Sequence, residues 1–171
     1  MKLPYRFILT TAVATLALAA CTNTKKQQQP PPPPGDTQTM THETNSGKYT
    51  VESLETDACL RQRVIYFDLD KTDIHSEFQA AISCHAAYLR QFPGARVTLE
   101  GNADERGTRE YNLGLGERRG NSVSSALSGA GASSSQLNVV SYGEERPVCR
   151  EHGEACWQKN RRVEIIYTSK Q

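Results

Sequence analysis

The sequence lacks a marked excess of charge of either sign. Its 171 residues carry 20 Lys and Arg against 19 Asp and Glu, which gives a formal net charge of +1. Proteins that bind nucleic acid through counterion release need a strong basic excess, so this balance argues against that class. Apolar residues make up only 37% of the chain, which indicates that part of it stays outside any folded core.

The sequence also lacks an apolar run of the roughly 20 residues that a membrane-spanning helix needs. Its one uncharged, mainly apolar stretch covers residues 7–20 and follows Lys2 and Arg6. A basic start, a short apolar centre and small residues at the end predict a secretory signal peptide over residues 1–20.

The end of this segment reads Leu18-Ala19-Ala20-Cys21 and resembles the lipobox of bacterial lipoproteins. The resemblance implies cleavage before Cys21 and lipidation of that residue. Because Thr22 and not Asp follows, it also implies export to the outer membrane, with the domain on its periplasmic face. Several acyl chains, at about 0.8 kcal/mol for each buried methylene, give a lasting anchor. The alternative is an ordinary signal peptide followed by a chance cysteine.

Residues 21–50 are predicted to form a tether between the lipid and a folded domain. They contain three consecutive glutamines, five consecutive prolines from Pro30 to Pro34, and then mostly Thr, Asn, Ser and acidic residues. This composition buries too little apolar surface to offset the entropy of ordering the chain, and proline runs are extended. A proline-rich docking ligand is the alternative, but no charged or aromatic specificity residue adjoins the run.

Residues 51–171 alternate between strand-like and helix-like patterns, which predicts one folded domain. Apolar residues at helical spacing predict a first helix that begins near Ser76, with Gln79 completing a capping box, and ends before Pro93. A second helix is predicted over residues 109–127. The order β-α-β-α-β-loop-β predicts an α+β sandwich, in which helices cover one face of a mixed four-stranded sheet. The four predicted strands cover residues 64–67, 96–100, 137–142 and 162–168.

One charged residue falls in the middle of the apolar stripe of the second helix. Arg119 lies among Tyr111, Leu115 and Val123 at helical spacing, and a buried guanidinium needs a partner. Asp104, in the loop that precedes the helix, is the nearest candidate. The pair predicts either an internal ion pair that braces the loop or a pocket in which both groups face a ligand.

The domain contains five short motifs, at residues 102–108 (NADERGT), 110–112 (EYN), 115–119 (LGERR), 141–147 (SYGEERP) and 160–162 (NRR). Together they resemble the OmpA-like peptidoglycan-binding domain, and residues 64–73 resemble the opening segment of the peptidoglycan-associated lipoproteins. The resemblance covers roughly residues 64–167. Three features depart from it: Gly120 stands where Ala is usual, Asn102 where His is frequent, and segment 149–156 is closer to the disulfide-bearing loop of some OmpA proteins.

The resemblance implies a protein that binds the cell wall without covalent chemistry and is not an enzyme. Its implied ligand is the diaminopimelate residue of peptidoglycan, with Arg119 binding the carboxylate and Asp104 the ammonium. Replacing either residue by Ala is then expected to abolish binding without unfolding the domain. The implied partners are peptidoglycan, the outer membrane and the Tol system with its periplasmic propeller protein, in envelope integrity and cell division. The implied binding residues are Asp70, Asn102, Asp104, Thr108, Leu115, Arg119 and Arg161, with Arg162 as the alternative to Arg161.

Two other functions stay open at this point. An OmpA-like wall anchor that is independent of Tol differs only in its partners. A peptidoglycan hydrolase needs a carboxyl acid such as Glu100, Asp104 or Glu105, but a neighbouring Arg119 lowers the pKa of Asp104, whereas a general acid needs a raised one.

Four cysteines of the domain, Cys59, Cys84, Cys149 and Cys156, are expected to form two disulfides, because an exported protein meets an oxidising compartment. Four cysteines allow three pairings, of which we favour Cys59 with Cys84 and Cys149 with Cys156. A metal site at Cys149, His152 and Cys156 is the alternative, but it lacks a clear fourth ligand. No metal and no cofactor is therefore expected.

Overall fold

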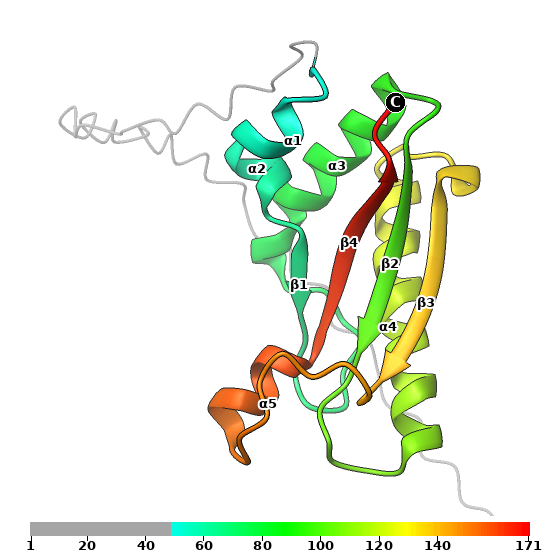
Figure 1. The fold of residues 1–171 in the computed structure, drawn as a ribbon. Coiled ribbons are helices and arrows are strands. Elements are labelled where there is room, and N and C mark those ends of the chain that lie inside the picture. Colours follow the sequence, from blue (N-terminus) through cyan, green and yellow to red (C-terminus); the bar gives the residue numbers. More distant parts are fainter. Residues whose placement is uncertain (1–48) are drawn as a thin grey trace, which may run out of the picture. The chain divides into compact units, whose positions relative to one another are not determined.

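The computed structural model describes residues 49–171 (Figure 1). The predicted signal peptide, the lipidation site Cys21 and nearly all of the predicted tether lie outside these residues and stay predictions. Within residues 49–171, no helix is both long enough and apolar enough to cross a membrane.

Four strands form one mixed sheet in the order β1-β4-β2-β3. β2 lies at the centre, parallel to β3 and antiparallel to β4, and β4 is also antiparallel to β1. This arrangement confirms the predicted α+β fold with a mixed four-stranded sheet. The strands are β1 (Val64–Tyr66), β2 (Arg96–Asn102), β3 (Leu137–Gly143) and β4 (Arg162–Ser169).

Two long helices, α3 (Gln79–Gln91) and α4 (Arg109–Gly129), lie behind the sheet as drawn in Figure 1 and cover one of its faces. Successive residues of a strand point to opposite faces, so Val97 and Leu99 of β2 point into the core while Thr98 does not. Leu127 of α4 is fully buried in the same core. The core therefore fills the space between the helices and a single sheet face.

The backbone of α4 lies unusually close to β2. A Cβ atom added at Gly101 would overlap the carbonyl group of Gly116, and one added at Gly116 would come within 2.8 Å of the Gly101 oxygen. Only glycine permits this approach. The close packing brings the first half of α4, including Arg119, down onto the end of β2.

Four short elements were not predicted, and a fifth, η1, lies where the first helix was predicted to begin. A four-residue helix lacks enough residues to show a hydrophobic period, so its sequence does not mark it. The predicted capping box at Ser76 and Gln79 is wrong, since residues 76–78 form a 3-10 turn without a side-chain cap, and the box occurs at Ser133 and Gln136 instead. The short elements are α1 (Ser53–Thr56), α2 (Ala58–Arg61), η1 (Ser76–Phe78), η2 (Ser134–Gln136) and α5 (Glu154–Asn160).

Two disulfides are present, and they confirm the favoured pairing. Cys59 of α2 is bonded to Cys84 of α3. Cys149, in the loop after β3, is bonded to Cys156 of α5. The second bond removes the metal site considered at Cys149, His152 and Cys156, because both thiols are consumed.

Candidate functional site

A cavity of about 320 Å³ opens where the end of β2, the loop after β1 and the start of α4 meet. Its walls combine leucine and tyrosine side chains with five charged groups. Five of the predicted binding residues, Asp70, Asp104, Leu115, Arg119 and Arg161, line it. The lining residues are Leu69, Asp70, Asp104, Arg106, Gly107, Tyr111, Asn112, Leu115, Arg119 and Arg161.

Arg119 is fully buried in α4 and is held by main-chain oxygens. Its Nε donates to the carbonyl of Lys71, Nη1 to that of Asn102 and Nη2 to that of Asp68, each at 2.9 Å. Each terminal nitrogen carries a second N–H, and neither of these two donors has a further partner among residues 49–171. Burial, followed by the charge of Arg161, lowers the pKa of Arg119 to about 10, so the group stays cationic at neutral pH.

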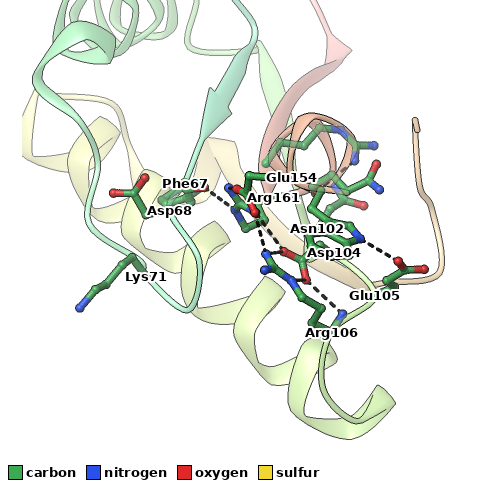
Figure 2. Close-up of polar contacts among 12 residues, drawn as sticks. Phe67, Asp68, Lys71, Asn102, Asp104, Glu105, Arg106, Glu154 and Arg161 are labelled. Atoms are coloured by element: carbon green, nitrogen blue, oxygen red, sulfur yellow. Dashed lines mark hydrogen bonds and ion pairs between the residues drawn. The ribbon is translucent and has the colours of Figure 1, made fainter. Parts of the chain in front are cut away.

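Asp104 is held by two arginines, neither of which is Arg119 (Figure 2). Arg106 donates from Nε and Nη2 to the two carboxylate oxygens at 3.1 and 2.6 Å, and its main-chain N–H donates at 3.0 Å. Arg161 donates from Nη1 at 3.1 Å. The direct Asp104–Arg119 ion pair considered from the sequence is therefore wrong, although both side chains line the same cavity.

These contacts keep Asp104 ionised. Burial alone raises the pKa of a carboxyl group, but the hydrogen bonds from Arg106 and Arg161 outweigh that effect, so the pKa of Asp104 lies below its usual value. Three guanidinium groups and two carboxylates line the cavity, which leaves an excess of one positive charge. A cavity with this balance favours a ligand that carries a carboxylate.

Asp70 lies at the rim, in an unusual backbone conformation. It has a φ of 57°, a left-handed value that Asp tolerates better than most residues. Two main-chain carbonyls of its loop, those of Asp68 and Lys71, accept from Arg119, so the buried arginine also fixes the loop that presents Asp70. The Tyr111 hydroxyl donates to Asp70, and this contact raises the pKa of Tyr111.

Three of the residues named from the sequence do not line the cavity. Thr108 caps α4, where its hydroxyl accepts from the main-chain N–H of Tyr111 at 3.2 Å. Asn102 offers its main-chain oxygen to Arg119, while its side chain donates to the carbonyl of Glu100. Arg162 is bound to Glu164 on the sheet, so Arg161, and not its alternative Arg162, lines the cavity.

Arg106 and Tyr111 are the main lining residues that sequence reasoning did not assign to the site. The sequence does contain a signal for Arg106. An Asp side chain often forms a turn by accepting a hydrogen bond from the main-chain N–H two residues later, and such a turn at Asp104 brings residue 106 next to its carboxylate. Tyr111 belongs to the apolar stripe of the second predicted helix, and with 44% of its surface exposed it lies at the rim of the cavity.

The carboxylates near the cavity do not suit acid catalysis. Hydrogen bonds from His152, at 2.6 Å, and from the indole of Trp157, at 2.7 Å, lower the pKa of Glu105. The pKa of Asp104 is also lowered, whereas a glycosidic acid needs a raised one. In the described part of the chain, no three His, Cys, Asp or Glu side chains are grouped so that they could hold a metal.

Comparison with known proteins places these features in context. Residues 66–161 match the OmpA family. The chain is similar to the peptidoglycan-associated lipoprotein of Haemophilus influenzae, with 41% identity over 156 residues that cover 91% of this chain and 94% of that protein. It is similar to the same protein of Legionella pneumophila, with 41% identity over 170 residues, 95% of this chain and 94% of that one.

The fold has a similar counterpart among solved structures. The crystal structure of the peptidoglycan-associated lipoprotein from Burkholderia pseudomallei superimposes with a TM-score of 0.66 at 40% identity. The match covers 68% of this chain and 98% of that one.

Proposed function

The chain belongs to the OmpA family and, within it, to the peptidoglycan-associated lipoproteins, and from this premise we propose that it binds the diaminopimelate residue of peptidoglycan without covalent chemistry. The relatives are named for association with the cell wall, a structural role and not a catalytic one. The observation that carries the proposal is Arg119, a buried cation with two N–H donors left over beside a cavity that Asp104 also lines.

The chemistry of the ligand matches the charges of the cavity. The side-chain end of diaminopimelate carries a carboxylate and an ammonium on one carbon. Arg119 presents a planar guanidinium to the carboxylate, and Arg106 adds a second donor. Asp104 and Asp70 supply the acceptors for the ammonium. The carboxylate of the ligand would thus pair with the arginines that give the cavity its positive excess, and the ammonium of the ligand would pair with the two aspartates.

The anchoring of Arg119 favours tight binding. Ordering a free side chain at an interface costs about 0.5–1.5 kcal/mol. Three main-chain carbonyls already fix the guanidinium of Arg119, so little of that cost remains when the ligand arrives. Leu115 and Leu69 provide apolar walls for the methylene groups of the ligand.

A sacculus pull-down tests the proposal. Full-length wild type is expected to sediment with purified diaminopimelate-type sacculi, while Asp104→Ala and Arg119→Ala are expected to stay in the supernatant. Asp70→Asn is expected to sediment less than wild type without loss of stability, because Asp70 is exposed. Asp73→Asn is the matched control, since Asp73 is also exposed but does not line the cavity. Equal sedimentation of all these variants would remove the site assignment.

Association with the cell envelope follows from the relatives, and the mode of attachment is part of the proposal. Acylated Cys21 would hold the chain in the outer membrane, and the tether over residues 21–50 would let the domain reach the wall. Tethering raises the local concentration of the domain, so modest affinity suffices. We expect the Tol system to be a partner, with its periplasmic propeller protein competing for the cavity face. Failure to co-purify with Tol proteins would favour a wall anchor that is independent of Tol.

A further inference from the structure

We propose that Glu154 and Trp157 of α5 are positioning residues, which hold Arg106 and Arg161 against Asp104, and that the Cys149–Cys156 disulfide fixes α5 for this role. The inference rests on the proposed function, because it concerns the same cavity. Neither Glu154 nor Trp157 lines that cavity. Both residues would act through the two arginines that do.

Glu154 bridges the two arginines that bind Asp104 (Figure 2). One of its carboxylate oxygens accepts from Nη2 of Arg161 at 2.6 Å, and the other lies 3.5 Å from Nη2 of Arg106. Asp104, Arg106, Glu154 and Arg161 thus form a closed ring of contacts in which negative and positive groups alternate. Without Glu154, three guanidinium groups around the cavity would face only Asp104 and Asp70.

Trp157 holds Arg106 from the other side. The guanidinium carbon of Arg106 lies 4.2 Å from the centre of the indole ring, within the range of a cation–π contact. The indole N–H donates to Glu105 at 2.7 Å. The single tryptophan of the chain therefore contacts two side chains of the loop that carries Asp104.

α5 needs external support to keep these side chains in place. It has only seven residues, and so short a helix is not stable on its own. The disulfide ties it to Cys149. The buried Asn160 side chain accepts from the main-chain N–H groups of Val148 and Cys149, at 2.9 and 3.1 Å, and donates to the carbonyl of Cys149 at 2.7 Å.

This arrangement makes a specific prediction about selectivity. The arginines determine how well the cavity receives a carboxylate, and α5 determines where Arg106 and Arg161 stand. Loosening α5 should therefore weaken binding of a ligand with the extra carboxylate more than binding of one without it. A residue with a purely structural role would change stability and leave that preference unchanged.

The test uses the full-length chain and two synthetic stem tripeptides, one ending in diaminopimelate and one in lysine, with affinity measured by calorimetry. Glu154→Gln is expected to weaken binding of the diaminopimelate peptide by about fivefold, the loss typical of one hydrogen bond of average strength. The substitution should also reduce the ratio between the affinities for the diaminopimelate and the lysine peptide. The urea midpoint of unfolding should stay unchanged. Glu151→Gln is the matched control, because Glu151 is an exposed carboxylate of the loop just before α5 and has no side-chain partner within residues 49–171.

Trp157 provides an independent arm. Trp157→Leu removes the aromatic face and is expected to lower affinity and selectivity, and Trp157→Phe, which keeps an aromatic face, is expected to restore part of both. In the wild type, ligand binding should change the emission of Trp157, because Arg106 lies against the ring.

The two disulfides provide the last arm. Cys149→Ser with Cys156→Ser is expected to lower affinity for the diaminopimelate peptide, whereas Cys59→Ser with Cys84→Ser is expected to lower stability alone, since that bond joins α2 to α3. Wild-type affinity and selectivity in the Glu154, Trp157 and Cys149–Cys156 variants would overturn the inference and leave the proposed function intact. A wild type that does not prefer the diaminopimelate peptide would overturn both.

Discussion

Arg119 combines two tasks that compete in most binding sites. It has to be rigid, and three carbonyl oxygens, two from the loop after β1 and one from the end of β2, make it so. It also has to keep donors for a ligand, and a guanidinium has five N–H groups, enough for both. A lysine, with one nitrogen, has no planar fork to divide between protein and ligand.

Replacement of Arg119 is therefore expected to affect stability as well as binding, contrary to the expectation from sequence. Arg119→Ala leaves the carbonyls of Lys71, Asn102 and Asp68 without their donors and opens a cavity in the core. We expect the free energy of unfolding to fall by about 3–5 kcal/mol in urea denaturation. Arg118→Ala is the matched control: Arg118 is exposed, and we expect a change within about 0.5 kcal/mol. Equal stability of the two variants would contradict the role assigned to Arg119.

A second buried residue makes stability depend on pH. His85 lies in the core, where one ring nitrogen donates to the carbonyl of Gln62 at 3.2 Å and the other accepts from the Tyr167 hydroxyl at 2.9 Å. Burial lowers the pKa of His85 to about 4. Between pH 6.5 and 4 the unfolded chain therefore binds a proton that the folded chain does not, so stability is lost as the pH falls through this window.

We expect the loss over this window to be about 3 kcal/mol in the wild type. His85→Gln, which does not titrate, should show a much flatter profile between pH 6.5 and 4, measured as the free energy of unfolding in urea. Asp104, whose pKa lies below its usual value, contributes a separate loss, most of which falls below about pH 4. A variant with the same slope as the wild type would show that another group is responsible.

At the level of the site, the sequence predicted the side chains better than their partners. Helical spacing placed Arg119 on a buried face, and the loop before the helix pointed to Asp104. The acceptors of Arg119 are main-chain carbonyls, which every residue possesses, so no side-chain pattern could mark them. The roles of Glu154 and Trp157 depend on contacts across 7 to 52 residues, which one sequence does not reveal.

Among the elements, α4 shows how the sheet and the site depend on each other. Its packing against β2 needs Gly116, where a Cβ would come within 2.4 Å of the Ser141 hydroxyl and 2.8 Å of the Gly101 carbonyl oxygen. From helical propensity alone, this residue costs about 1 kcal/mol relative to Ala. The close approach that it permits brings Arg119 within reach of the Asn102 carbonyl.

Gly116→Ala is accordingly expected to destabilise the fold, by about 1–3 kcal/mol, despite the better helical propensity of Ala. Gly129→Ala is the matched control in the same helix. A Cβ at Gly129 would meet nothing within 4 Å, so we expect it to stabilise the protein by up to about 1 kcal/mol. Thermal unfolding of the two variants beside the wild type measures both effects. A stabilising Gly116→Ala would show that the helix can move away from the sheet.

The long elements of the fold were predictable, and so was the three-residue strand β1, but the short helices were not. β2, β4 and α4 each contain seven or more residues, and the predicted order β-α-β-α-β-loop-β of all strands and helices indicated the mixed sheet. α5 is held by a disulfide and by Asn160, both of which are contacts of the folded state. Its sequence predicted a disulfide loop without a helix.

At the scale of the whole molecule, we expect different parts of the chain to determine the affinity for the wall and the distance over which the domain can extend. The rigid domain over residues 51–171 holds the cavity, and affinity is set there. Under the proposed function, the predicted tether over residues 21–50 would decide only whether that cavity meets the wall while an acylated Cys21 stays in a membrane. The two properties should therefore be separable by mutation.

Deletion of residues 27–46 tests whether affinity for the wall and the length of the tether are independent. An extended chain spans about 3.1 Å per residue, so the deletion reduces the maximum reach of the predicted tether from roughly 90 Å to roughly 30 Å. We expect the shortened protein to bind purified sacculi as well as the wild type does, because its cavity is intact. In cells, chemical cross-linking of the lipoprotein to the wall should fall sharply, and a Gly/Ser insert of equal length should restore it. Unchanged cross-linking after the deletion would show that a short tether is long enough to reach the wall. If the native segment restores cross-linking and the Gly/Ser insert does not, a docking role for the prolines is favoured.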